Sequence, residues 1–386
     1  MYNKKSKYII LMFISVLFLS GCTGSKNIQD LTYIVSIGLD YDKSKDEYTA
    51  YLQGLNFANV AKQEGTRPIE PIPTFVGSAS GKTLNMAVSN LYKLTRPPLF
   101  FGHTKALVLS RDLLENKFKE VLEDVGRNRS LRPSLELFTT DMNMEEVFSA
   151  KGLFDYPPVY TVLLTEEKVE SLQDEIETMS LMHFLREYYE PMGTAFIPNI
   201  RIDQDSWKSG DKLPLLYLDG YNVFQDAQLM GHISSEDSIL VDWLMKDHST
   251  LNYSLFKEED LLSTFKLSSK KPKVKYSKED SGFPKFSLEV NVEAELLEKI
   301  NDVPYEELQS TLEDSIEKRV ETVYNRGLEN QMDLYDVGVK WFRSHPKEFK
   351  KLKEDKSFYL TDNSLDKVKV NVNIKHFNAY RYEKRQ

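Results

Sequence analysis

The sequence predicts an α+β protein of two to three successive domains, each a mixed or antiparallel sheet with packed helices, behind a short N-terminal signal peptide. Apolar residues recur with strand character in residues 34–39, 286–294 and 368–374. Amphipathic stripes of helical period lie between such runs, as in residues 84–94 and 304–326. A chain of 386 residues is also longer than a domain with a single hydrophobic core usually is, which favours more than one domain.

The chain begins with a short basic and apolar segment. Three lysines precede an apolar run at residues 8–19, and small residues follow it, which is the anatomy of a secretory signal. The run is shorter than the roughly 20 residues that a membrane-spanning helix needs. Leu19-Ser20-Gly21-Cys22 resembles the lipobox of bacterial lipoproteins, in which the cysteine is diacylglycerylated and becomes the new N-terminus. Cys22 is the only cysteine in the chain, so an ordinary signal peptide with a chance cysteine is the weaker alternative. We therefore predict a signal peptide at residues 1–21, lipidation of Cys22 and a lipidated tether at residues 22–30.

Composition and charge fit an exported, lipid-anchored body. Hydrophobic residues make up 41% and charged residues 28%, as in ordinary globular chains. The net charge is −9, and removal of residues 1–21, which hold three lysines and no acid, takes it to −12. A body of this charge is repelled by nucleic acid and by anionic lipid, so we expect the acyl chains to supply the membrane attachment. A single cysteine also excludes an intrachain disulfide.

Residues 31–203 are predicted to form an N-terminal α+β domain. It opens with a hairpin of two strands around a turn at residues 42–46, and Asn143 with Glu146 has the pattern of a helix N-cap with its reciprocal acid. Residues 161–190 are predicted to be helical, with a core stripe of Leu181, Phe184, Leu185 and Tyr188. The remaining expected elements are a helix at 84–94, a strand at 105–109, a helix at 114–125 and a strand at 134–139.

A polar, turn-forming stretch at residues 201–214 predicts the first domain boundary. A middle α+β domain at residues 212–268 follows, with strands at 215–218, 221–224 and 229–233 and a helix from Ser235. A C-terminal α+β domain at residues 284–386 contains the strand 286–294, a long helix from Pro304 to about Arg326, and the strand 368–374. That last strand alternates Val or Ile with Lys or Asn, which predicts one buried and one solvated face.

Residues 77–83, Gly-Ser-Ala-Ser-Gly-Lys-Thr, approach the phosphate-binding pattern G-x-x-x-x-G-K-[ST]. The spacing is one residue short, and the preceding stretch is short and contains Pro73, so it is a poor strand. We interpret the segment as a glycine-rich entry to the helix at 84–94 and expect no nucleotide at Lys82.

Two basic clusters each allow two interpretations. Arg127, Arg129 and Arg132 either form an anion or partner site or, as we favour, cap a helix and pair with local acids. The lysine-rich stretch at residues 266–285 either contacts lipid headgroups or an acidic partner or, as we favour, is a solvated linker or edge strand.

Catalytic patterns are sparse. The six histidines show no metal-binding spacing, no G-x-S-x-G motif occurs, and acylation of Cys22 would leave no free thiol. Paired carboxylates for glycoside cleavage remain open among 59 acids. We predict no catalytic residue, no cofactor and no metal site.

The order of motifs resembles the Ger(x)C family of spore germination lipoproteins over nearly the whole chain. The lipobox is followed by Ile37-Gly38-Leu39-Asp40, Gly81 before the helix, Phe101-x-His103-x-Lys105 and Arg127-x-x-x-x-Arg132-Pro133. Gly220-Tyr221-Asn222-Val223-Phe224, Leu229-Met230-Gly231 and the strand from Phe286 to Glu298 continue the match. One departure is Thr23-Gly24 after the cysteine, where many members have Trp.

This resemblance implies a C-subunit of a nutrient germinant receptor, built of successive α+β domains and lipid-anchored on the outer face of the spore inner membrane. It implies A-type and B-type membrane subunits as partners and a role in assembly or signalling during nutrient-induced germination. The family brings no catalytic residue, and only Cys22 matches a functional position. The alternatives are a solute-binding lipoprotein, which needs a cleft between two lobes, and a cell-wall hydrolase, which needs acids or a metal in a groove.

Overall fold

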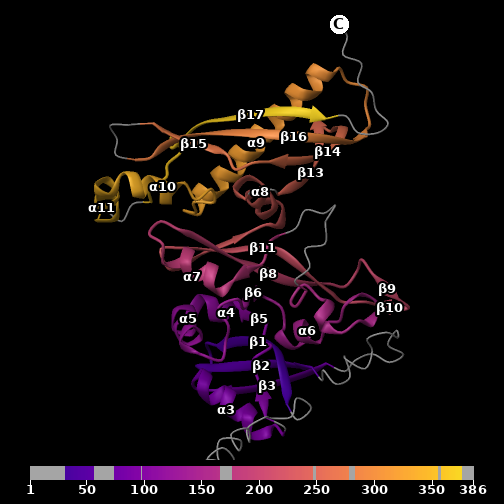
Figure 1. Ribbon diagram of the computed structural model, residues 1–386, viewed down its shortest axis with the longest axis vertical. Helices are drawn as coiled ribbons and strands as arrows, with labels where there is room; N and C mark the ends of the chain where they lie inside the picture. The colour runs from indigo at the N-terminus through magenta and orange to yellow at the C-terminus, as the bar shows by residue number, and fades with distance from the viewer. Residues whose placement is uncertain are drawn as a thin grey trace, which may run out of the picture.

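The computed structural model describes residues 31–55, 74–96, 98–165, 176–246, 249–277, 283–354 and 358–375. Cys22, the predicted signal peptide and the tether up to residue 30 lie outside these ranges. Two large β-sheets with their helices are stacked along the longest axis of the molecule (Figure 1).

The first sheet has the order β12-β11-β8-β6-β5-β1-β2-β3, with β4 beside β1 and β7 beside β6. Its centre is parallel, because β1, β5, β6 and β8 pair in the same direction, and its flanks are antiparallel hairpins. The strands are β1 (Thr32–Asp42), β2 (Glu47–Leu55), β3 (Phe75–Gly81), β4 (Leu99–Phe100), β5 (Ala106–Ser110), β6 (Glu136–Thr140), β7 (Met179–Ser180), β8 (Thr194–Asp203), β11 (Leu215–Gln225) and β12 (Gln228–Ile233).

Both faces of the first sheet are covered. Along β5, Leu107 and Leu109 pack against helices on one face, and Ala106 and Val108 belong to the core of the other face. A parallel strand buried on both sides is a continuous apolar run, as Ala106–Leu109 is. The first face carries α3 (Leu84–Leu94), α4 (Arg111–Asn116), α5 (Phe118–Arg127) and α7 (Leu181–Tyr189), and the second carries α6 (Met144–Ser149).

The second sheet has the order β13-β14-β16-β15, and β17 pairs with β16 in parallel along the other edge of β16. The long helix α9 (Tyr305–Glu329) buries the predicted stripe from Leu308 to Val323 against it. The strands are β13 (Thr250–Lys257), β14 (Asp260–Ser269), β15 (Lys273–Ser277), β16 (Lys285–Lys299) and β17 (Leu365–Lys375). Two further helices, α10 (Val337–Ser344) and α11 (Pro346–Glu354), follow α9 and were not predicted.

One helix, α8 (Ser235–Met245), lies between the two sheets (Figure 1). Trp243 and Leu244 of α8 share one hydrophobic core with Tyr221 and Val223 of β11 and with the inner face of the second sheet. The two units are therefore joined by a common core around α8.

The sheets divide the chain differently from the predicted domains. Residues 201–203 end β8 and residues 204–214 are the loop of a hairpin, since β8 and β11 pair antiparallel. A small hairpin of β9 (Lys208–Ser209) and β10 (Asp211–Lys212) lies within this loop. Of the predicted middle domain 212–268, β11 and β12 extend the first sheet while β13 and β14 belong to the second. The polar composition of residues 201–214 reflects an exposed hairpin loop rather than a linker between sheets.

Several predicted elements need correction. The helix expected at 161–190 is confined, among the described residues, to α7, because 161–165 is a turn and Met179–Ser180 pairs with β6. The helix expected at 114–125 is two helices that meet at Lys117. The two strands expected at 215–224 are one strand, in which Gly220 has a φ of +74° beside a shift in register. A β-carbon at Gly220 would meet the Ile233 carbonyl oxygen, so both the backbone angle and the space require glycine.

Candidate functional site: a polar junction between the two sheets

Helix α8 carries two buried carboxylates that point to different neighbours. The helix begins after Ser234, whose hydroxyl oxygen accepts a hydrogen bond from the Asp237 N–H. Asp237 and Asp242 are each only 5% exposed, although acids are rarely buried unless they are paired. Asp237 binds the second unit and Asp242 binds the first, so α8 is held from both sides.

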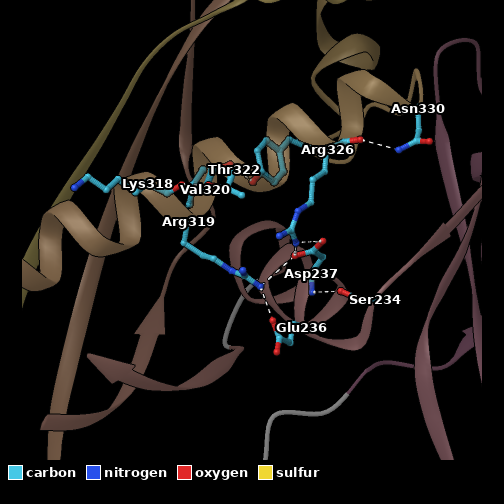
Figure 2. Close-up of polar contacts among 10 residues, drawn as sticks. Ser234, Glu236, Asp237, Lys318, Arg319, Val320, Thr322, Arg326 and Asn330 are labelled. Carbon is cyan, nitrogen blue, oxygen red and sulfur yellow. Dashed lines mark hydrogen bonds and ion pairs between the residues drawn. The ribbon is translucent and has the colours of Figure 1, made fainter. Parts of the chain in front are cut away.

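Asp237 binds two arginines of α9, as Figure 2 shows. Arg326 donates from Nη1 to both carboxylate oxygens at 2.8 and 2.9 Å, and Arg319 donates from Nη2 to Oδ1 at 3.1 Å. Arg319 also pairs with the exposed Glu236 at 3.2 Å. The two arginines are seven residues apart, which places them on one face of α9 two turns apart. The hydrogen bond to Asp237 is the main cause that raises the pKa of Arg326.

Asp242 binds β11 and the segment before β7. The Tyr221 hydroxyl donates to Asp242 Oδ2 at 2.5 Å, and the Glu177 N–H donates to the same oxygen at 3.2 Å. Lys246 lies 2.7 Å from Asp242 Oδ1 and 3.1 Å from Glu177. Burial raises the pKa of Asp242 and Lys246 opposes this rise, so the lysine is the counter-ion that allows the carboxylate inside the junction.

A second buried network joins the units at the other side of the junction, around Asp333. Asp333 Oδ2 accepts from the Tyr359 hydroxyl at 2.6 Å and from the Gly338 N–H at 2.7 Å. Gln225, at the end of β11, accepts from the Asp333 N–H and donates to the Tyr359 hydroxyl. Thr194, at the start of β8, donates to the Asp333 carbonyl oxygen at 2.9 Å. Burial raises the pKa of Asp333, and its donors oppose the rise.

Asp336, three residues after Asp333, is a further buried carboxyl of this junction with a raised pKa. Burial, reinforced by Asp333 and Glu187, raises its pKa to about 8, while the Thr194 N–H and Lys340 act in the opposite direction. Its Oδ1 atom is buried without a hydrogen-bond partner in the described structure. The residue also has a φ of 47°, in the left-handed region, at the start of α10. Outside the network, Arg343 of α10 pairs with Glu190 of the first unit at 2.8 Å.

Two cavities of the described structure lie in the first unit. A groove of about 400 Å³ lies between the α4–α5 junction, Tyr188 and the β11–β12 turn. A polar pocket of about 120 Å³ lies where β5 and β6 end, and is lined by Arg111, Thr139, Thr140, Asp141, Asn199, Arg201, Asp219, Asn222 and His232. Its charged groups already satisfy one another in part, since Arg201 pairs with both Asp141 and Asp219. Neither cavity is formed by two lobes, as the solute-binding alternative required.

The residues singled out from the sequence do not gather at one place. Lys82 follows β3 and donates to the Lys45 carbonyl oxygen at 2.7 Å, so the glycine-rich segment is an edge strand that leads into a helix capped by Thr83. Arg127 caps α5 and pairs with Glu123 as favoured, whereas Arg129 and Arg132 are exposed. The lysine-rich stretch contains the edge strand β15, where Lys275 pairs with Glu289 at 2.9 Å.

Sequence reasoning missed the junction acids. Asp242 had a signal, because it lies within the apolar run Ile239–Leu244 of a helix. Asp333 and Asp336 had a weaker one, since they flank Leu334 and Tyr335 in an apolar stretch. Within the described ranges, His, Cys, Asp and Glu form no group of three that could hold a metal ion. No described helix has both the length and the apolar character needed to cross a bilayer.

The fold and the junction define a two-unit α+β protein whose buried charges tie its two sheets together. Residues 24–202 match the family model described as the spore germination protein N-terminal domain, and residues 219–378 match the model of the spore germination B3/GerAC-like C-terminal domain. The chain belongs to the Ger(x)C family of spore germination proteins.

Individual relatives extend over nearly all of the chain. Spore germination protein KC of Bacillus subtilis is 23% identical over 96% of this chain and 96% of its own length. Spore germination protein GerQC of Bacillus cereus is 23% identical over 91% of this chain and 94% of its own length. The crystal structure of the GerBC protein matches with a TM-score of 0.52 and 18% identity, over 91% of this chain and all of the other, which confirms the α+β fold.

Proposed function

We propose that this chain is a non-enzymatic C-type subunit of a spore germinant receptor, attached to the outer face of the spore inner membrane through lipidated Cys22. It would act with A-type and B-type membrane subunits in nutrient-induced germination. The family membership and the names of the relatives support the germination role. The lipobox at Leu19–Cys22 supports the anchor.

The observation that carries the role is the junction. The buried charged groups of the junction bind partners on neighbouring elements. Asp242 and Tyr221 join α8 to β11, and Asp237 and Arg326 join α8 to α9. Catalysis needs such groups to face a substrate, whereas here they bind one another. When two units are joined by such contacts, a displacement of one unit is carried to the other, which suits a role in assembly or signalling.

The anchor is tested by Cys22→Ala in sporulating cells. We expect loss of the protein from the spore membrane fraction, because the acyl chains supply the attachment. Mass spectrometry must show the diacylglyceryl group on the parent chain and must exclude an uncleaved signal on the variant. Membrane retention of a processed Cys22→Ala chain would contradict the proposal.

The partners are tested by purifying the tagged, lipidated chain from spore membranes in mild detergent. We expect the two polytopic receptor subunits to co-purify. A chain recovered without either subunit, although it is lipidated and membrane-bound, would refute the receptor role and leave the anchor standing.

A further inference from the structure

Exposed apolar side chains gather on the first sheet at the strand ends where β1 begins. The register places the start of β1, the end of β2 and the start of β3 together, since Tyr33 lies opposite Leu55 and Gly54 lies opposite Phe75. β4 pairs with the start of β1, and Tyr92, near the C-terminal end of α3, has its ring 6.2 Å from that of Phe101. We call Phe75, Tyr92, Leu94 and Phe100, which are 60%, 44%, 80% and 38% exposed, the tether-side patch.

Part of the tether-side patch is held in place from beneath. The Phe100 ring packs edge-on against the buried Tyr33 ring at 5.6 Å and lies 5.8 Å from the ring of His103. Leu94 ends α3, whose inner face is fixed in the core by Ala87 and Leu91. Apolar side chains presented by ordered elements cost little further entropy when another surface covers them.

The same end of the sheet is basic, although the net charge of the chain is negative. The parallel strands β1, β5 and β6 begin there, so the loop before β6 lies about two strand spacings, roughly 10 Å, from β1. Residues 31–33, 53–55, 74–77, 91–96, 98–105 and 128–134 contain no Asp or Glu. They contain the exposed cations Lys93, Arg96, Lys105, Arg129 and Arg132. In a body with a net charge of −12 after processing, this is a local reversal of sign.

The chain itself indicates what covers this surface. Nine residues lie between Cys22 and Thr32 at the start of β1, and the ten steps of a fully extended chain span at most about 35 Å. A diacylated Cys22 would therefore keep the start of β1 within that distance of the bilayer. Aromatic and leucine side chains with a rim of Lys and Arg are the composition that binds at the interface of a bilayer with anionic lipid.

We propose that the tether-side patch and its rim of cations dock on the anionic bilayer surface, as a second, non-covalent membrane contact that orients the anchored protein. The inference rests on the proposed lipidation of Cys22. It gives Arg129 and Arg132, which the helix cap does not use, a partner in the lipid phosphates. It also assigns the acidic remainder of the molecule to the side that faces away from the membrane.

The test introduces a single free thiol, since acylation of Cys22 leaves none in the parent chain. Because Cys22 is acylated, Leu94→Cys introduces a single reactive cysteine that can be labelled with a polarity-sensitive fluorophore in the full, lipidated chain. Asn373→Cys, on an exposed position of β17 in the other unit, is the matched control. The proteins are placed in vesicles of phosphatidylcholine with a minority of phosphatidylglycerol, and then in phosphatidylcholine alone.

We expect the label at residue 94 to shift to the blue on addition of the mixed vesicles and to be quenched by lipids that carry a quencher in the acyl chain. The label at residue 373 should do neither. The shift at residue 94 should weaken in phosphatidylcholine alone and in the variant Lys93→Glu with Arg96→Glu.

Each other result would overturn the proposal. A label at residue 94 that stays in water, on protein whose lipid is shown by mass, refutes the docking but leaves the anchor intact. A label that is already in an apolar environment without vesicles shows that protein, and not lipid, covers the patch. Absence of lipid on Cys22 in the mass spectrum refutes the anchoring instead.

Discussion

At the scale of single residues, the junction depends on carboxylates that are buried but paired. Asp237 gives up its hydration and gains three charged hydrogen bonds from Arg319 and Arg326. Such a pair is a weak source of net stability, since desolvation offsets the attraction, but removing one partner is costly. The arginines are only partly buried, so water can replace some of what they lose.

Asp237→Ala should lower the free energy of unfolding by about 1–3 kcal/mol, because two arginine contacts and the α8–α9 connection are lost. The matched control is Glu236→Ala, which removes an exposed partner of Arg319 and should cost less than about 0.5 kcal/mol. Urea unfolding of both purified variants measures the difference. Equal losses of unfolding free energy in the two variants would mean that the burial of Asp237 adds nothing to its contribution to stability.

Asp336→Asn should remove a dependence of stability on pH. The folded pKa of about 8 lies above the usual value of 3.8, so the folded state binds more protons than the unfolded state between these values. Stability of the parent chain therefore falls as pH rises through this window. Asn has no proton to lose, matches the shape of Asp and tolerates the left-handed backbone at this position.

The measurement is the urea midpoint of both proteins from about pH 6 to about pH 9, across the raised pKa. We expect the Asn variant to gain roughly 1–3 kcal/mol relative to the parent at the upper end, a value reduced by the partial solvent contact of the carboxyl. Parallel pH profiles would show that Asp336 is ionised throughout. Asp333 and Glu187 raise the pKa of Asp336, and the Thr194 N–H and Lys340 lower it, so these are the groups that face the carboxyl.

At the scale of elements, β17 is an edge strand whose outer backbone is covered by side chains of α9. Glu317 accepts from the Val370 N–H at 2.9 Å, and Glu313 accepts from the Val372 N–H at 2.8 Å. Gln309 donates to the Val372 carbonyl oxygen at 3.0 Å. These three residues are four apart, on one face of the helix. Backbone N–H and C=O groups of β17 that could otherwise pair with another chain are therefore hydrogen-bonded within the molecule.

Val370→Asp should destabilise the second unit by several kcal/mol, because Val370 is buried and its backbone already lies beside Glu317. Asn371→Asp, on the wet face beside Asn291, should change stability by less than about 0.5 kcal/mol. Thermal unfolding of the two variants compares them. If the second unit helps to hold the receptor together, Val370→Asp should also lower the levels of the membrane subunits in spores. Equal thermal stability would mean that the faces are misassigned.

The elements predicted correctly from the sequence are those that bury one continuous face along their length, because such a face gives a regular apolar repeat. The strand at 368–374 and the helix at 304–326 appear as predicted, because each buries a single stripe along its length. Among the described residues, the helix predicted at 161–190 is found only at α7, since residues near 177 are placed by contacts with Asp242 and not by a local repeat. The junction could not be predicted, because it joins residues as far apart as Gln225 and Asp333.

At the scale of the molecule, two α+β units share a single core at α8. The predicted α+β fold class is confirmed, with two large sheets and the small two-stranded sheet of β9 and β10 in the described residues. The family models divide the chain between residues 202 and 219, yet β8 and β11 on either side of that division are neighbours in one sheet. The C-terminal family segment therefore completes the sheet of the N-terminal one.

The strand order of the first sheet also sets a distance along the membrane. The strands follow one another along the long axis from β3 through β1 to β11 (Figure 1), and the eight strands from β3 to β12, spaced about 4.8 Å apart, span about 34 Å. The tether-side patch lies where β1, β5 and β6 begin, so docking it directs these strands toward the bilayer and lays their order along the membrane surface. The second unit then lies beside the first along the membrane, on the side away from β3. Receptor parts that meet the second unit must therefore be displaced sideways from the anchor, whereas parts next to Cys22 can reach only the first unit.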